Sequence, residues 1–217
     1  MEIFQAYTGS RRLYVDPNEK VKEGTVIRDL KSLSYFIFEK DSKGAPWVVT
    51  YYPETDELPE ELDRIAAALM DWGKPFILVV DEFFNFSRTG HKLCQKLVRL
   101  IRVRAKFPAV VVLVSHRPTD IPPAYISTVN RWLTFRQTYK PDVERIKADT
   151  GCVNVDLVQQ LKAHHFALWR GRELEFFDAK SRPIYLDVET SPQAQGPAPG
   201  PGQTEPATFN QGAGAGS

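Results

Sequence analysis

The sequence predicts a three-layer α/β domain with a mostly parallel sheet and an antiparallel hairpin at one sheet edge near the C-terminus. Segments 76–80 and 110–114 are continuous apolar runs, which are typical of parallel strands buried on both faces. Segments with helical periodicity alternate with them, as in βαβ units. The 42% hydrophobic and 25% charged residues are ordinary for a globular protein.

The 217 residues are expected to form one domain over 1–190 and a tail over 191–217. The first part has the size of a single domain that buries most of its unfolded surface. The tail consists largely of Pro, Gly, Gln, Ala and Ser and has almost no large apolar residues. It cannot bury enough surface to offset the entropy of ordering, so we expect a disordered linker.

Local signals define the elements before residue 76. Asp16-Pro17 is a turn signal that closes a strand over 11–17. The β-branched and aromatic run 47–52 lies between two prolines, which is typical of a strand. Two helices are predicted over 26–40 and 57–72, and the second has an acidic first turn that suits the positive end of the helix dipole.

The second half of the chain continues the alternation. Gly171-Arg172 lies between two apolar-rich runs and predicts a hairpin that would add antiparallel strands at one edge of the sheet. The other predicted elements are a long helix over 87–106, a strand over 131–136, and short helices over 141–149 and 156–163.

Two adjacent carboxylates, Asp81 and Glu82, follow the buried run 76–80. The carboxyl ends of parallel strands face the crevice where α/β sheets bind ligands. An Asp there can bind Mg²⁺ directly or through water, and the Glu beside it points to the other side of the strand. The alternative is a simple acidic exit from strand to loop, because five apolar residues followed by Asp-Glu also occur by chance.

The order of motifs resembles the HerA/FtsK group of DNA-pumping ATPases, which includes viral genome-packaging ATPases. The resemblance covers roughly residues 11–150. It rests on an apolar strand ending in Asp81-Glu82 (a Walker B element), a basic helix, an apolar strand ending in Ser115-His116-Arg117-Pro118, and then Asp120-Ile121-Pro122. The strand that ends in Asp16-Pro17 fits the same pattern.

The resemblance implies a P-loop NTPase-like fold with ATP and Mg²⁺ as cofactors. Asp81 would bind the metal and the nucleotide, Glu82 would polarise the attacking water, and Ser115 and His116 are candidate sensors of the γ-phosphate. A ring of identical subunits that acts on DNA, in the cytoplasm or associated with the virion, is also implied. Arg104, which is either structural or acts across an interface, and Arg136 are candidates for an arginine finger supplied in trans.

One part of the family pattern is missing. No G-x-x-x-x-G-K-S/T phosphate loop occurs, and ten residues precede Arg11, whereas a strand, loop and helix need about 30. Three explanations are open: the chain begins inside the first helix, residues 1–7 are a degenerate first strand, or another cluster binds the phosphates. Because the loop Lys and the backbone cradle make the main phosphate contacts, we expect weak or no ATP hydrolysis by this chain alone.

Five basic residues of the predicted helix over 87–106 recur at helical spacing. At ~100° per residue their spacings of 4, 3, 3 and 4 place them on one face, within an arc of about 120°. This face is interpreted as a solvated surface, a DNA-phosphate stripe or a subunit interface. The five residues are Lys92, Lys96, Arg99, Arg102 and Lys106.

Composition excludes few functions. The net charge of +1 indicates no partner by itself, and no apolar run reaches the roughly 18 residues of a membrane span. Cys94 and Cys152 fit no metal-ligand spacing and are interpreted as free thiols.

The motifs lead to two hypotheses for the function. The first is an ATPase-family subunit in DNA translocation or viral genome packaging, active or degenerate. The second is a non-catalytic pseudo-ATPase that acts as a structural or interaction subunit.

Overall fold

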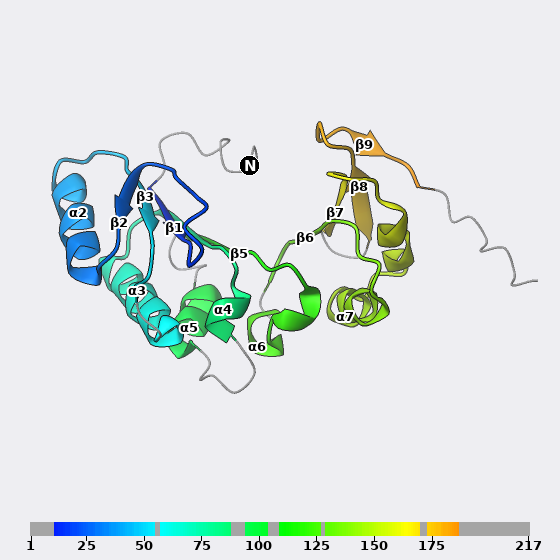
Figure 1. The fold of residues 1–217 in the computed structure, drawn as a ribbon, viewed down its shortest axis with the longest axis horizontal. Helices are drawn as coiled ribbons and strands as arrows, with labels where there is room; N and C mark the ends of the chain where they lie inside the picture. Colours follow the sequence, from blue (N-terminus) through cyan, green and yellow to red (C-terminus); the bar gives the residue numbers. More distant parts are fainter. Residues whose placement is uncertain are drawn as a thin grey trace, which may run out of the picture. The chain divides into compact units, whose positions relative to one another are not determined.

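The computed structural model describes residues 11–54, 57–87, 94–103, 109–126, 129–169 and 173–186. Within them the chain forms two sheets, one of five strands and one of four (Figure 1). The predicted α/β class is confirmed, whereas the predicted tail over 191–217 lies outside the described residues.

The five-stranded sheet is entirely parallel, in the order β2-β3-β1-β4-β5. The predicted strand 76–80 is β4, and all five of its residues are buried. The strands of this sheet are β1 (Arg12–Val15), β2 (Thr25–Ile27), β3 (Val48–Tyr51), β4 (Phe76–Val80) and β5 (Ala109–Leu113).

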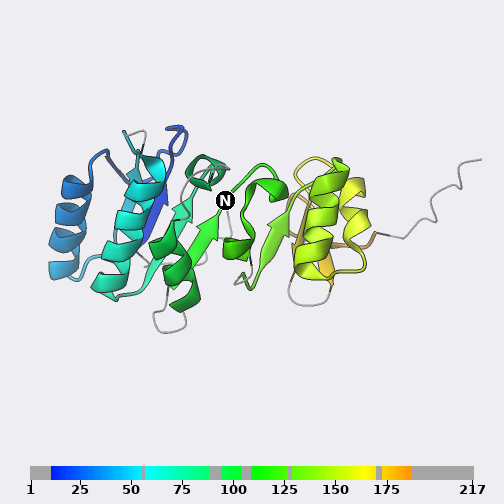
Figure 2. The ribbon, with the colours of Figure 1, turned by 90° about the horizontal axis from the view of Figure 1, so that it is seen from below.

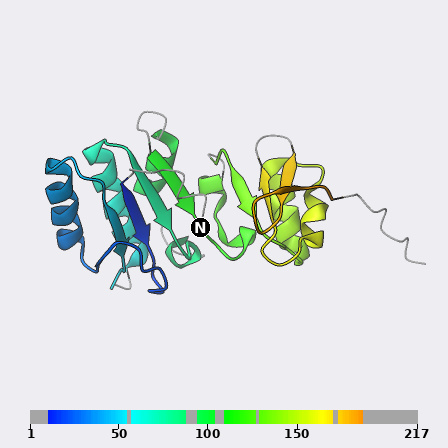
Figure 3. The same cartoon turned by 90° about the horizontal axis from the view of Figure 1, so that it is seen from above.

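Three helices pack on one face of this sheet and form the main core with it. They are α2 (Leu30–Ser42), α3 (Leu58–Trp72) and α5 (Gln95–Val103). Figure 2 shows them on the near side of the strands, and Figure 3 shows the strands from the opposite side. A smaller apolar cluster on the other face contains Tyr14, Ile77 and Val79, and no residue of a described helix belongs to it.

The four-stranded sheet is antiparallel, in the order β6-β7-β8-β9. The predicted hairpin is present as β7 and β8, but it belongs to this second sheet rather than to the edge of the first. A separate core joins the second sheet to α7 and to a 3-10 helix, η3. The elements are β6 (Trp132–Thr134), α7 (Lys140–Thr150), η3 (Val155–Gln160), β7 (Phe166–Trp169), β8 (Leu174–Phe177) and β9 (Pro183–Ile184).

Two predicted helices begin in the wrong place. Residues 25–27 pair with β3, so the helix predicted over 26–40 begins at Leu30, where the Asp29 carboxylate accepts a hydrogen bond from the backbone N–H of Ser32 at 2.8 Å. The helix predicted over 87–106 begins as α5 at Gln95, because Asp63 of α3 accepts from two N–H groups of its first turn, those of Lys96 and Leu97.

Three short elements complete the described fold: α4 (Phe84–Ser87), η2 (Pro118–Asp120) and α6 (Pro123–Ile126). No helix in the described ranges is both long enough and apolar enough to cross a bilayer.

Candidate functional site

Two aspartates follow adjacent strands at the carboxyl edge of the parallel sheet. Val15 of β1 and Val80 of β4 are register partners, so Asp16 and Asp81 come next on each strand. The backbone N–H of Asp81 donates to the carbonyl of Val15 at 2.9 Å, which continues the pairing past the end of β4. The sheet thus fixes the position of Asp81 through its backbone.

The Asp16 carboxylate holds the loop that follows β1. It is buried and accepts hydrogen bonds from the backbone N–H groups of Asn18 at 2.8 Å, Lys20 at 2.6 Å and Val21 at 2.7 Å. An Asp side chain that accepts from a backbone N–H two residues later forms an Asx-turn, and here the same carboxylate also accepts from N–H groups four and five residues later. Asp16 is therefore part of the loop structure rather than a free ligand.

Asp81 is half-buried and has one internal hydrogen bond, from the backbone N–H of Glu82 to Oδ1 at 3.0 Å. Burial raises the pKa of Asp81, and the negative charges of Asp16 and Glu82 raise it further, against the opposing effects of that hydrogen bond and of Lys20. A bound cation would stabilise the charged form of this carboxylate, and the carboxylate is partly exposed, so Asp81 is suited to bind a cation.

Glu82 adopts an unusual backbone conformation, with φ at +47°. Its side chain is only 13% exposed, and Oε1 lies 2.8 Å from His116 Nε2 and 3.5 Å from Lys20 Nζ. The His116 side chain is 79% exposed. Two basic groups from different loops therefore approach one carboxylate oxygen.

The strand pairing of β4 with β5 brings the two predicted motifs together. The N–H of Val114 donates to the carbonyl of Val80 at 2.9 Å, and the N–H of Phe83 donates to the carbonyl of Val114 at 2.7 Å. Ser115 follows directly, and its hydroxyl donates to the Arg117 carbonyl at 3.2 Å. The predicted residues Asp81, Glu82, Ser115 and His116 thus occupy one edge of the sheet.

The segment after β5 is fixed to α7 by a buried carboxylate. Asp142 is 2% exposed and accepts from Arg117 Nε at 3.2 Å and from Thr119 Oγ1 at 2.7 Å. Arg145 donates through Nη2 to the Ile121 carbonyl at 3.2 Å. The Arg117 guanidinium also lies over the Tyr139 ring, 4.7 Å from its centroid. The loop that carries Ser115 and His116 is consequently anchored on the second half of the chain.

Other predicted site residues lie elsewhere. Arg136 follows β6 of the second sheet and is exposed, and no contact described in the structure joins it to Asp81 or Glu82. Of the five basic residues, Lys96, Arg99 and Arg102 lie on the exposed side of α5, opposite its buried apolar residues. Three predicted residues, Arg104, Lys92 and Lys106, are outside the described residues.

Two residues near the site were not predicted from the sequence. Lys20 lies beside Glu82 because Asp16 holds its backbone, and the Asp16-Pro17-Asn18 turn was the available signal for that loop. Asp142 sits in the first turn of α7, where an acidic residue has an ordinary role at the helix N-terminus. Nothing in its local sequence distinguishes it.

The cluster fits Mg²⁺ better than it fits the phosphates of ATP. No group of three or more His, Cys, Asp or Glu side chains in the described residues could enclose a metal ion. Mg²⁺ typically binds proteins through one or two carboxylates, with water and substrate phosphates as the other ligands, so Asp81 alone suffices for the protein's share. A phosphate-binding loop, in contrast, is absent from the sequence.

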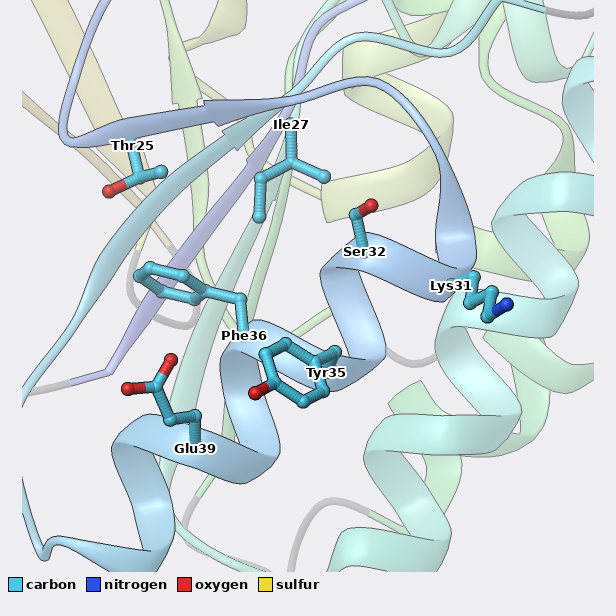
Figure 4. Close-up of a pocket in the computed structure, with 7 residues that line it drawn as sticks. All are labelled: Thr25, Ile27, Lys31, Ser32, Tyr35, Phe36 and Glu39. Atoms are coloured by element: carbon cyan, nitrogen blue, oxygen red, sulfur yellow. The ribbon is translucent and has the colours of Figure 1, made fainter.

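A cavity of about 580 Å³ lies apart from these carboxylates, between β2 and α2 (Figure 4). β2 is the strand at the sheet edge opposite β5. The only acidic residue that lines the cavity is Glu39, which is paired with Lys43 at 2.6 Å. The cavity has no residue in common with the cluster around Asp81.

No protein-family model and no curated protein sequence matches the chain. Solved structures do match. The genome-packaging NTPase B204 of Sulfolobus turreted icosahedral virus 2, in complex with AMPPCP, aligns with a TM-score of 0.64 at 16% identity, over 85% of this chain and 88% of that chain. B204 of Sulfolobus turreted icosahedral virus, described as a DNA-packaging ATPase, aligns with a TM-score of 0.62 at 14% identity, over 85% and 87%.

VirB4 of Thermoanaerobacter pseudethanolicus also aligns, with a TM-score of 0.55 at 12% identity, over 82% of both chains. The chain therefore shares its fold with the genome-packaging NTPase B204 and with VirB4. At these identities the likeness concerns the fold. In this fold Asp81 follows the central strand β4 of the parallel sheet, and Ser115 comes after β5, the neighbouring strand. The resemblance inferred from the sequence is confirmed at the level of the fold.

Proposed function

We propose that the chain is an ATPase-family subunit that takes part in DNA translocation or viral genome packaging. The observation that carries this proposal is the convergence of Asp81, Glu82, Ser115 and His116 at the carboxyl edge of two paired strands. The fold supports it, because the solved structures that share this fold include genome-packaging NTPases, one of them in complex with ATP-gammaS.

Each residue of the cluster has a role in this proposal. Asp81 would hold Mg²⁺, which would supply positive charge to offset that of the nucleotide phosphates. Glu82 accepts a proton from, or orients, the attacking water. Ser115 and His116 contact the terminal phosphate from the neighbouring strand. In the present geometry His116 and Lys20 both approach the Oε1 atom of Glu82.

The proposed partners are DNA and further copies of the same chain. The exposed residues Lys96, Arg99 and Arg102 on α5 are suited to DNA phosphates. Arg136, which is exposed after β6, is the residue proposed to reach the site of a neighbouring subunit. This role places the protein in the cytoplasm or with the virion.

The second candidate function is a non-catalytic relative that retains the sheet as a scaffold. The absent phosphate loop favours it, because the main β- and γ-phosphate contacts are missing from the sequence. This pseudo-ATPase would bind partners through its surface and would not need Asp81.

Calorimetric titration with Mg²⁺–ATP separates the two functions. Micromolar affinity that is lost in Asp81→Asn supports a nucleotide site. The matched control is Asp41→Asn, a carboxylate that pairs with Arg11 and Lys74 and lies outside the cluster. Absence of binding at millimolar ATP refutes catalysis by the 217-residue chain and leaves the scaffold function.

A further inference from the structure

The four-stranded sheet has one face that lies outside the apolar cores. Trp132, Ala167, Leu174 and Phe176 project from the other face into the core shared with α7 and η3. Because side chains alternate along a strand, their neighbours project from the opposite side, here called the outer face, which Figure 3 shows from the side away from α7. Among the described residues, no apolar side chain of the outer face belongs to a core. This face includes Leu133, Phe135, Phe166, Leu168, Glu175 and Phe177.

Three phenylalanines form a row across the outer face. Phe166 of β7 and Phe177 of β8 are register partners, and their rings stack with the centroids 5.1 Å apart. Phe135 comes one residue after the pair of Thr134 with Ala167, so it reaches the same row from β6. Its ring lies edge-to-face with that of Phe166, with 6.4 Å between the centroids, and Phe135 is 55% exposed.

Tyr185 adds a fourth aromatic ring to this face. Ile184 and Leu186 pack toward the core of the second sheet, so Tyr185 between them projects to the outer face. It is 97% exposed. Single exposed apolar residues are common on protein surfaces, but a continuous aromatic patch is typical of a binding surface. The arrangement of these rings therefore indicates a ligand that aromatic side chains can hold.

The edge of the sheet beside the phenylalanine row is basic. At this edge β6 and β8 end and β7 and β9 begin. The segments that meet there are 135–136, 162–166 and 177–183, and their one carboxylate, Asp178, accepts a hydrogen bond from Arg182 Nε at 2.7 Å. The other exposed basic residues of these segments are Arg136, Lys162, His164 and Lys180.

Rings on a surface and positive charge along its edge together fit a single-stranded nucleic acid. Every base has a flat face that stacks on an aromatic side chain, while the phosphates follow the basic groups. In a duplex the bases are already stacked on each other and cannot reach the rings. The carboxylates on this side of β8, Glu173 and Glu175, lie beyond the phenylalanine row, so a strand that follows the row keeps its phosphates away from them.

We propose that the outer face of the second sheet binds single-stranded DNA. The bases stack on Phe135 and its neighbours in the row and on Tyr185, and the phosphates lie along the basic edge. This surface has no residue in common with the cluster around Asp81, so its binding of DNA does not require ATP. The choice of DNA over RNA rests on the proposed function, whereas the stacking surface itself does not.

Fluorescence anisotropy with a labelled oligo(dT) of about 15 nucleotides, in the absence of ATP, tests this proposal. Phe135→Ala should weaken the binding of oligo(dT) by about 10-fold, and Phe135→Trp should retain it, because any aromatic ring can stack on a base. Affinity for a duplex should be the same in both variants. The matched control is Tyr35→Ala, which removes a 69% exposed ring from α2 and should leave oligo(dT) binding unchanged.

Photochemical crosslinking gives a second readout that locates the bound strand. An oligonucleotide that carries 5-iododeoxyuridine should crosslink to the peptides that contain Phe135 or Tyr185, and mass spectrometry identifies them. The proposal is overturned if the wild-type chain does not bind oligo(dT), if Phe135→Ala and Tyr185→Ala both bind it as the wild type does, or if the crosslinks lie only on α5.

The other possible occupants give different results, and each of them also overturns the proposal. Tighter binding of oligo(rU) than of oligo(dT) would assign the face to RNA. A lower molecular mass of Phe135→Ala in light scattering, with unchanged affinity for oligo(dT), would assign it to a second copy of the chain. Failure of the proposed ATPase function would appear separately, as absent binding of Mg²⁺–ATP in calorimetry, and would not alter the affinity for oligo(dT).

Discussion

Asp16 and Asp81 follow paired parallel strands at equivalent positions, yet only Asp16 has its carboxylate saturated by backbone N–H groups. Burial, and after it the negative charges of Asp16 and Glu82, raise the pKa of Asp81. The fold therefore contains one aspartate that stabilises it and a neighbouring one that is held at a cost, as at many functional sites.

Asp81→Asn should stabilise the nucleotide-free protein by about 1 kcal/mol at neutral pH. An acid whose pKa is raised by folding makes the folded state less stable as pH rises through its unfolded pKa toward its folded one. Asn resembles the protonated form, so the gain should be small near pH 4 and grow toward pH 7. Urea unfolding across this range measures it, and a destabilisation that is equal at every pH would contradict it.

Asp16→Ala should change the free energy of unfolding in the opposite direction and destabilise the protein by about 3 kcal/mol. Three backbone N–H groups lose their acceptor, and the loop that holds Lys20 beside Glu82 loses its anchor. Chemical denaturation of both variants measures their free energies of unfolding and compares the roles of Asp16 and Asp81. If both variants shift the unfolding midpoint alike, the distinction between the two aspartates is wrong.

Asp142→Ala should cost about 2 kcal/mol, because Thr119 and Arg117 lose a buried acceptor. The matched control is Glu39→Ala, which removes an exposed i,i+4 pair with Lys43 and should cost less than about 0.5 kcal/mol. The free energy of unfolding in urea is the measurement. Equal losses for the two variants would show that Asp142 is not a structural anchor.

The cysteines should be unreactive in the folded protein. Cys94 and Cys152 are free and buried, and burial raises the pKa of the Cys94 thiol to about 12. Since the thiolate is the reactive form, alkylation of Cys94 at about pH 8 should require unfolding. Mass spectrometry should find no modified thiol in native buffer and both thiols modified in urea. Rapid native labelling of a Cys152→Ala variant would contradict the burial of Cys94.

Neutralising the stripe on α5 tests the proposed DNA binding. Substitution of Lys96, Arg99 and Arg102 by Gln should weaken binding to duplex DNA of any sequence. The slope of log K against log salt concentration should become shallower by about 1 for each DNA phosphate that the variant no longer neutralises. The control replaces three lysines of the α2 region, Lys31, Lys40 and Lys43, with the same change in charge. Equal effects in fluorescence anisotropy would indicate a general charge effect and not a site.

The buried strands and the pairing of the two polar motifs could be predicted from the sequence. The run 76–80 is apolar at every position, and a strand buried on both faces requires this. His116 and Glu82 follow the neighbouring strands β5 and β4, so the sheet brings them to the same edge, where their side chains lie 2.8 Å apart. Local patterns decide such features, because pairing in a parallel sheet aligns the strand ends.

Other features depend on interactions between distant segments. β2 has only three residues and is a strand because β3 pairs with it, whereas its local sequence predicts the start of a helix. The start of α5 depends on Asp63, more than 30 positions earlier. The sequence predicts the hairpin of β7 and β8 and the strand over 131–136, but the pairing of β6 with β7 depends on tertiary packing that no local signal encodes.

The attachment of the segment after β5 to α7 has a mechanical consequence. Arg117 and Thr119 share the carboxylate of Asp142, and the Ile121 carbonyl is bound by Arg145, so this stretch has little freedom to deform by itself. We therefore expect a displacement of Ser115 to be transmitted to α7 through these hydrogen bonds. The short segment is a direct connection between the core of the parallel sheet and the core that contains α7.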